Sequence, residues 1–109
     1  MAYKYLFYDS YMEKIRQQWL RSIHSVEVQV GGKWYRGELN QKEIVSKNIL
    51  TLTATFPELD SKECTITAYR IIDINGDVAA SQNRTINKAS GQGTMIKIEI
   101  NIIEDPVRI

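Results

Sequence analysis

The sequence predicts a mainly β protein: a small antiparallel β-sandwich or open barrel of six to seven strands with one N-terminal amphipathic helix. Three observations support this. From residue 25 onward, apolar and polar residues alternate in short runs, which is the period of half-buried strands. Glycine, asparagine and proline separate those runs at short intervals. No segment after residue 24 has a helical period, so the crossover helices that a parallel sheet requires are not predicted.

Length and composition predict one soluble domain spanning 1–109, with an aromatic strand and a helix in 1–24 and antiparallel strands in 25–109. Hydrophobic residues make up 43% of the chain and charged residues 25%, which is ordinary for a globular domain. The net charge is +1, so no overall field points to nucleic acid. No apolar run approaches the ~20 residues that a membrane helix requires. We therefore expect no nucleic-acid partner and no membrane partner.

Cys64 is the only cysteine of the chain, so no disulfide can form within it. A chain of this size can bury roughly 65% of the surface of its unfolded state, which is enough for a core without disulfide or metal. The N-terminus lacks the long apolar core and the cleavage site of a signal peptide. These features favour a cytoplasmic protein, or a virion protein if the gene belongs to a phage.

The first predicted element is a strand in AYKYLFYD, because aromatic side chains favour a pleated, half-buried surface. A helix follows from Ser10 to about Ser22. Ser10 and Glu13 have the spacing of a capping box, in which each side chain satisfies a backbone N–H at the helix start. Two faces at helical spacing complete the pattern: the apolar residues are Met12, Ile15, Trp19 and Ile23, and the polar ones are Lys14, Gln17, Gln18 and Arg21.

The period changes to two at SVEVQV, which places Val26, Val28 and Val30 on one face. Gly31-Gly32 can adopt the positive φ angles of a two-residue hairpin turn, and KWYRGEL returns as the partner strand. The sequence therefore predicts that its first hairpin begins immediately after the helix.

Four further runs supply the remaining strands. NILTLTATF alternates, and Pro57 helps to end it because proline cannot donate to a ladder. ECTITAYRIIDI has apolar residues on both faces, which predicts a central position, and DVAASQNRTI follows it after an Asn-Gly turn. In the first run, the inward residues are Leu50, Leu52, Ala54 and Phe56, and the outward ones are Thr51, Thr53 and Thr55. In the last run, TMIKIEINII, one face consists of Ile96, Ile98, Ile100 and Ile102.

Asp73, Asn75 and Asp77 stand at alternate positions, as in the first half of an EF-hand calcium loop. The rest of that loop does not fit, because the required glycine is Val78 and the required bidentate glutamate is Arg84. Asn-Gly between two strand-like runs is also a strong hairpin signal, with both residues at positive φ in a type I′ turn. We predict a hairpin and no metal site.

Two other patterns have simpler interpretations than a site. SGQGT, residues 90–94, lacks the Gly-Lys-Ser/Thr and the helix of a phosphate loop, so a connection between strands is favoured, with a ligand-contacting loop as the alternative. His24 and Cys64 are the sole candidates for a Cys-His nucleophile pair. Nothing marks either residue, and a free cysteine is usually a small buried hydrophobe. We predict no catalytic residue, no cofactor and no enzyme.

The position of Trp34 depends on the length of the Gly31-Gly32 turn. A two-residue turn pairs Gln29 with Trp34 and puts the indole on the polar face, whereas a three-residue loop sends it to the valine face. The core placement is favoured, because tryptophan is highly buried on average. In the exposed placement, Trp34 would be the best single anchor for a partner.

Five of the chain's ten aromatic residues lie within its first eleven positions. They could cover one edge of the sandwich and help to dock the helix, or form a contact surface, since tyrosine is enriched where proteins meet. Base stacking is disfavoured, because Lys4 is the one cation close by. The residues of the predicted interaction surface are Tyr3, Tyr5, Phe7, Tyr8, Tyr11 and Trp34.

The functional expectation is a non-catalytic structural or protein–protein interaction module that binds a protein partner or further copies of itself. A subunit of a phage tail or neck, or of another virion-like assembly, is expected by fold-level analogy. The alternative is a carbohydrate- or small-ligand-binding β module in which Trp34 or the tyrosines form a stacking platform. Sugar binding predicts an exposed aromatic ring flanked by Asp, Asn or Gln in a groove, whereas assembly predicts an apolar patch buried between chains.

Overall fold

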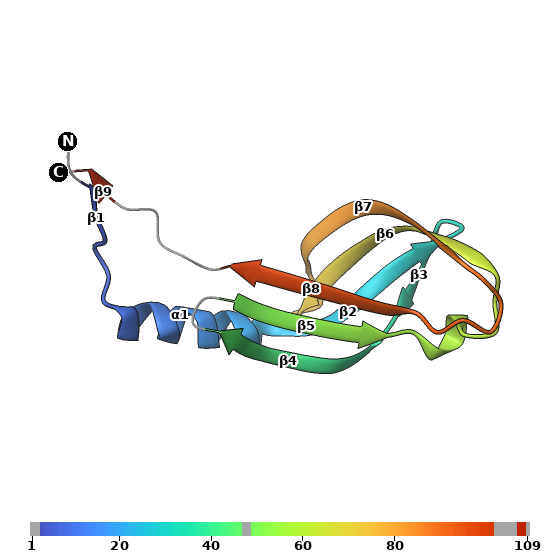
Figure 1. The fold of residues 1–109 in the computed structure, drawn as a ribbon, viewed down its shortest axis with the longest axis horizontal. Helices are drawn as coiled ribbons and strands as arrows, with labels where there is room; N and C mark the ends of the chain where they lie inside the picture. Colours follow the sequence, from blue (N-terminus) through green and yellow to red (C-terminus); the bar gives the residue numbers. More distant parts are fainter. Residues whose placement is uncertain (1–2, 47–48, 102–106, 109) are drawn as a thin grey trace.

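Two antiparallel sheets and one N-terminal helix make up the computed structural model, which describes residues 3–46, 49–101 and 107–108 (Figure 1). The helix, α1 (Asp9–Ser22), runs directly into the first sheet, which has the order β3-β2-β6-β7. Its strands are β2 (Ile23–Val30), β3 (Lys33–Arg36), β6 (Cys64–Asp73) and β7 (Val78–Lys88). The second sheet has the order β4-β5-β8, with β4 (Glu38–Ser46), β5 (Ile49–Thr55) and β8 (Met95–Asn101). The predicted fold is confirmed: seven strands form two sheets that do not close into a barrel.

The two sheets adjoin along two seams, which differ in how they are joined. At one seam, β3 continues through Gly37 into β4, and the Gly37 amide donates to the Val26 carbonyl at 2.9 Å. At the other seam lie β7 and β8, which follow one another along the chain. In the described part of the chain, β7 pairs with β6 alone and β8 with β5 alone. The seam between β7 and β8 is therefore open.

The molecule is elongated, because its N-terminal part extends beyond the sheets. The principal extents are 55 × 27 × 24 Å and the radius of gyration is 16.9 Å, against about 13 Å for a compact chain of this length. In Figure 1 the first turns of α1 project past the ends of the sheets. At the tip, β1 (Tyr3–Lys4) pairs antiparallel with β9 (Val107–Arg108).

Of the described residues in AYKYLFYD, Tyr3 and Lys4 form the predicted strand, and the prediction is wrong for residues 5–9, the last of which begins α1. A strand needs a neighbour to satisfy its backbone groups. Among the described residues, the two of β9 are the neighbours that pair with this segment. Aromatic composition alone therefore gave the wrong conformation here.

The helix begins one residue before Ser10, and the predicted capping box does not form. Tyr8 is the N-cap, and its side chain makes no capping hydrogen bond. Ser10 therefore lies inside the first turn rather than at the position from which a hydroxyl can cap. Glu13 accepts a hydrogen bond from Gln17 at 3.2 Å and lies 3.7 Å from the Arg16 guanidinium. The predicted end at Ser22 is confirmed.

The predicted two-residue turn joins β2 to β3, and it decides where Trp34 lies. Gly31-Gly32 has φ angles of 58° and 79°. Gln29 pairs with Trp34 and Val28 with Tyr35. Because Val28 lies in the core, Trp34 lies on the opposite face of the sheet. The core placement favoured for Trp34 is wrong, since the register set by this turn outweighs the average burial of tryptophan.

The predicted hairpin between β6 and β7 is present, but its turn is not type I′. Asn75 has an ordinary negative φ, and Gly76 has a φ of 85°. The Asp73 amide donates to the Asp77 carbonyl at 2.9 Å, and the Gly76 amide donates to the Asp73 carbonyl at 3.0 Å. This is a three-residue loop, in which a type I turn is followed by a left-handed glycine. The Asp73 carboxylate stabilises it by accepting from the Asn75 and Asp77 amides.

Replacing Gly76 by valine is expected to lower the free energy of unfolding by about 1 kcal/mol or more, because a β-branched residue resists positive φ. Urea denaturation monitored by circular dichroism measures this change. Gly93→Val is the matched control, since Gly93 has no positive φ and a Cβ there would meet nothing within 4 Å. Equal denaturation midpoints for Gly76→Val and the unmodified chain would show that the left-handed conformation is not required.

The core lies between the sheets and follows the predicted inward residues. Leu50, Leu52, Ala54 and Phe56 are each at most 1% exposed. In β8, Ile96 is buried while Ile98 and Ile100 pack half-buried against the core, and Ile102 lies outside the described residues.

Thr51 and Thr53 point away from the core side of β5, yet both are buried. Thr51 pairs with Glu43 and Glu99 on the two neighbouring strands, and long side chains at such positions flank the shorter threonine. The Thr53 hydroxyl donates to the side-chain oxygen of Gln41 at 2.8 Å. The predicted outward face of these threonines is therefore confirmed, although neighbouring side chains bury both.

Candidate interaction surface

The N-terminal arm, defined here as residues 3–8, exposes large apolar side chains together with the first turn of α1. The exposed fractions are 65% for Tyr5, 65% for Leu6, 46% for Phe7, 84% for Tyr8 and 47% for Tyr11. The rings of Phe7 and Tyr11 stack with centroids 5.0 Å apart. Figure 1 shows the arm leaving the helix on the side away from the sheets. Four of the predicted interaction residues, Tyr5, Phe7, Tyr8 and Tyr11, thus lie together on a projecting element, and Tyr3 precedes them in β1.

The helix docks through its C-terminal half and without the tyrosines. Trp19 and Leu20 are half-buried against a core cluster formed by Ile23, Leu52 and Ile71. The apolar stripe predicted for α1 therefore meets the core at the end of the helix that runs into β2. The interpretation in which tyrosines help to dock the helix is wrong for Tyr5, Tyr8 and Tyr11, because these three side chains remain exposed.

Trp34 belongs to a charged network on the outer face of the first sheet, apart from the arm. The Arg70 guanidinium lies over its indole ring, 4.0 Å from the centroid. Arg70 also donates to one carboxylate oxygen of Glu27, at 2.8 Å from Nε and 2.7 Å from Nη2. Arg36 lies 3.5 Å from the other oxygen of Glu27. The Glu27 side chain is 11% exposed, so these two cations compensate for its desolvation.

This network bears on the carbohydrate alternative. Trp34 is half-buried, and the guanidinium of Arg70 stacks on one face of its ring. A sugar needs an open aromatic face, so at most the other face of the indole could receive it. Gln29 pairs with Trp34, and its side-chain oxygen is within 3.4 Å of the Thr67 hydroxyl. The polar partner next to the ring is therefore already engaged in the sheet.

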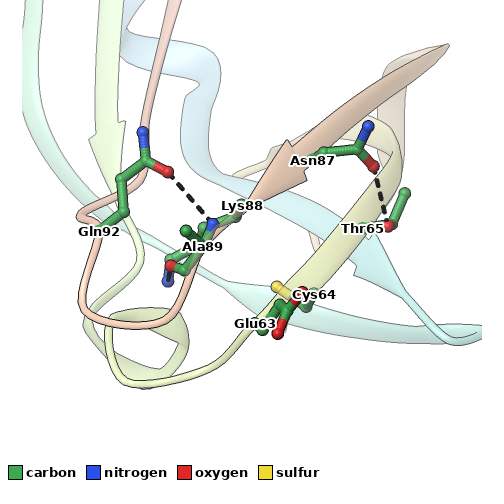
Figure 2. A pocket seen from close by; sticks show the side chains of 7 residues that line it. All are labelled: Glu63, Cys64, Thr65, Asn87, Lys88, Ala89 and Gln92. Atoms are coloured by element: carbon green, nitrogen blue, oxygen red, sulfur yellow. Dashed lines mark hydrogen bonds between the residues drawn. The ribbon is translucent and has the colours of Figure 1, made fainter.

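A polar pocket of about 570 Å³ lies where β6 begins and β7 ends (Figure 2). It is lined by Glu63, Cys64, Thr65, Asn87, Lys88, Ala89 and Gln92. Cys64 is half-buried, and the Thr65 hydroxyl donates to Asn87 at 3.0 Å. No aromatic side chain is among these seven residues, so the pocket lacks the stacking platform of a sugar site.

Lys88, which lines this pocket, binds backbone carbonyls from two separate loops. It is 4% exposed, and its ammonium donates to the carbonyls of Asp60 at 3.1 Å, Lys62 at 2.8 Å and Ala89 at 3.0 Å. Three carbonyl oxygens use all three donors of the ammonium. The amine thereby stabilises the loop that contains the short helix η1 (Pro57–Leu59) against the end of β7. Sequence reasoning missed this residue, since an isolated lysine carries no pattern.

The remaining sequence patterns occupy strand ends, a turn and a loop of the described part of the chain. His24 lies next to Asp73, at the far end of β6 from Cys64, which at ~3.3 Å per residue separates the pair by roughly 30 Å. SGQGT joins β7 to β8, and its Gly91 amide donates to the Asp60 carbonyl at 2.9 Å. Within 3–46, 49–101 and 107–108, no three His, Cys, Asp or Glu side chains gather as metal ligands would.

The open seam holds a cleft of about 450 Å³. It is lined by Tyr69, Ile71, Ala80, Ser81, Gln82, Ile98, Glu99 and Ile100, from β6, β7 and β8. The Tyr69 hydroxyl donates to the side chain of Gln82 across β6 and β7. Sequence reasoning did not find this cleft, because it exists only where two strands adjacent in the chain fail to pair.

These features define a mainly β protein with two antiparallel sheets, an amphipathic helix and a projecting aromatic arm. No described helix is long and apolar enough to cross a membrane. Comparisons with protein-family models, with curated proteins and with solved structures gave no match. Function is therefore inferred from the surface itself.

Proposed function

We propose that this protein is a non-catalytic protein–protein interaction module that joins a larger structure through its N-terminal arm. One observation carries the proposal: Tyr5, Leu6 and Tyr8 are each at least 65% exposed on an element that projects from the sheets. Single exposed apolar residues are normal on soluble proteins, but a contiguous group of them marks a contact site.

The energetics of burial support this role. An aromatic side chain can bury about 150–250 Å², and apolar area removed from water contributes about 25 cal/mol per Å². Scaled by their exposed fractions, covering Tyr5, Phe7 and Tyr8 would therefore stabilise a complex by roughly 10 kcal/mol before the costs of association, which are about 4–15 kcal/mol. Tyrosine also brings a hydroxyl that can remain hydrogen-bonded at the rim of an interface.

Three of the polar groups that could serve in a site have structural uses, which favours a non-catalytic role. The Lys88 ammonium binds three carbonyls, the Asp73 carboxylate holds a turn, and Glu27 pairs with two arginines. A subunit of a phage tail or neck, or of another virion-like assembly, is the kind of protein in which such a module would serve, by analogy of fold.

Deleting residues 1–8 tests the proposal. The truncated chain is expected to lose its partner or its self-association while keeping a cooperative thermal melt, because α1 docks through Trp19 and Leu20 rather than through the arm. Light scattering coupled to size-exclusion chromatography measures the oligomeric state, and circular dichroism measures the melt. Replacing exposed Val45 by serine is the matched control, since it removes an apolar side chain elsewhere on the surface.

Two outcomes would contradict the proposal. If the truncated chain fails to fold, the arm is part of the folded core. If it folds and associates as before, the contact lies elsewhere, and Trp34 with its neighbours becomes the next surface to change.

A further inference from the structure

We propose that the arm of one copy of this chain inserts into the open seam between β7 and β8 of a second copy. The inserted segment would act as an additional strand and close the seam. This inference rests on the proposed function of the arm, and it names both the partner and the receiving site.

The seam offers the two things that an incoming strand needs. β7 and β8 each have one unpaired edge in the described part of the chain, and such edges present free N–H and C=O groups to an added strand. Between them lies the cleft of about 450 Å³, whose apolar walls include Ile71, Ala80, Ile98 and Ile100. A strand placed here would both extend the ladders and fill the cleft.

β7 is the least protected of the long edges. It is the longest strand of the described residues, and residues 78–85 are all exposed. Within 78–87 its single charged residue is Arg84, and it has no proline. Charged residues and proline are the devices with which sheet edges are usually protected from pairing. β4, the edge of the other sheet at the opposite seam, carries Glu38, Lys42 and Glu43 and has two irregularities in its register.

The arm has the composition that this cleft would take. From Tyr3 to Tyr8 every residue except Lys4 is apolar or aromatic. Six extended residues span about 20 Å, which exceeds the roughly 7 Å between the first and last lining residues of β8. The charges are complementary as well, since Lys4 is the single charge of the arm and Glu99, at the exposed rim of the cleft, is the single charge among its lining residues.

Geometry favours a second copy over the chain's own arm. The 14-residue helix, about 21 Å long, stands between the arm and β2, and β1 pairs with β9 at the tip of the projection. The arm therefore points away from its own seam (Figure 1). If two copies exchange arms, the same contact occurs twice in a closed two-fold dimer.

The area available is sufficient for such a dimer. Tyr5, Phe7 and Tyr8 from each of two arms, at about 150–250 Å² per side chain scaled by their exposed fractions, would bury roughly 600–1,000 Å² from the arms alone. The walls of the two clefts add to this. The total reaches the ~1,200–2,000 Å² of a stable interface.

The test combines two defective full-length chains. Ala80→Trp blocks the cleft at an exposed position of β7, and Tyr5→Asp with Tyr8→Asp disables the arm at two exposed positions. Each chain alone is expected to dimerise at least tenfold more weakly than the unmodified protein in analytical ultracentrifugation. Mixed together, they are expected to form a 1:1 complex, because one intact arm then meets one intact cleft. Asn83→Trp, on the same strand but outside the cleft, is the control that should leave dimerisation unchanged.

A charge exchange provides a second measurement that does not add bulk. Lys4→Glu or Glu99→Lys alone is expected to weaken dimerisation, and the double variant is expected to restore it. Glu99 is exposed and pairs with Lys97 at 3.2 Å, so its replacement should leave the fold intact.

The outcomes separate this inference from the proposed function. Suppose that the arm variant loses association, that Ala80→Trp dimerises like the unmodified chain, and that the mixture shows no additional 1:1 complex. The arm then docks elsewhere and the seam is the wrong receiving site. If the unmodified chain is monomeric at all concentrations, the second copy is wrong and the arm serves a different protein. If the arm variant associates normally, the proposed function fails together with this inference.

Discussion

Replacing Phe56 by alanine is expected to lower the free energy of unfolding by about 3–5 kcal/mol, the cost of removing a buried phenylalanine and leaving a cavity. Phe56 is 1% exposed and is the largest of the fully buried side chains of the described residues. It packs in the cluster that contains Val26, Val28 and Ile66 from the first sheet. Its ring therefore joins the end of β5 to the opposite sheet, and its removal would leave a cavity between the two sheets.

Chemical denaturation with fluorescence detection measures this loss. Tyr8→Ala is the matched control, because Tyr8 is 84% exposed and surface changes are usually within about 0.5 kcal/mol. A loss below about 1 kcal/mol for Phe56→Ala would mean that the two sheets do not pack around this ring.

Replacing Gly37 by alanine is expected to lower the free energy of unfolding by about 1–3 kcal/mol, the usual cost of overpacking. A Cβ at Gly37 would lie 2.6 Å from an edge carbon of the Phe56 ring and 2.9 Å from the Thr55 carbonyl oxygen. The backbone must approach this closely because Gly37 turns the chain from β3 into β4, and its amide bonds the Val26 carbonyl. The ring and the backbone oxygen would both have to move.

Gly93→Ala controls for the change of residue type, since a Cβ there would meet nothing within 4 Å. The same substitution at Gly37 is expected to cost less in a Phe56→Leu background, because the ring that it strikes is then absent. Unfolding midpoints of the two single variants and the double variant give the coupling. Additive losses would show that Gly37 and Phe56 are not in contact.

The alternation of residues was sufficient to predict most strands. Leu50, Leu52 and Ala54 face the core at period two, and a central position for ECTITAYRIIDI is confirmed by the pairing of β6 between β2 and β7. Local patterns succeed here because the hydrophobic free energy depends on the apolar area that each side chain buries, whichever residues cover it. The end of the helix at Ser22 was predicted for the same reason, since the period changes there.

The conformation of short segments was predicted less well. Asn75-Gly76 suggested a type I′ turn, but the Asp73 carboxylate binds two backbone amides and favours a type I turn with Gly76 left-handed. Ser10 and Glu13 had the spacing of a capping box, and the helix nevertheless begins at Asp9. In both places several local hydrogen-bond patterns were available to the same residues, and their free energies differ by only about 1 kcal/mol.

For the candidate surface, the sequence by itself determined the aromatic N-terminal segment, the helix behind it and most of the strands, although β4 (Glu38–Ser46) was not predicted as a strand of its own. Tertiary structure decided where they lie. Trp34 faces outward because Gly31-Gly32 fixes its pairing with Gln29, and the arm projects because α1 docks by its other end. The cleft depends on residues that are still farther apart in the sequence. Ile71, Ala80 and Ile98 come from three different strands, and they line one cleft because β7 and β8 do not pair. The periodicity of the sequence indicates which face of each strand is buried. The order of the strands depends instead on contacts between residues far apart in the chain.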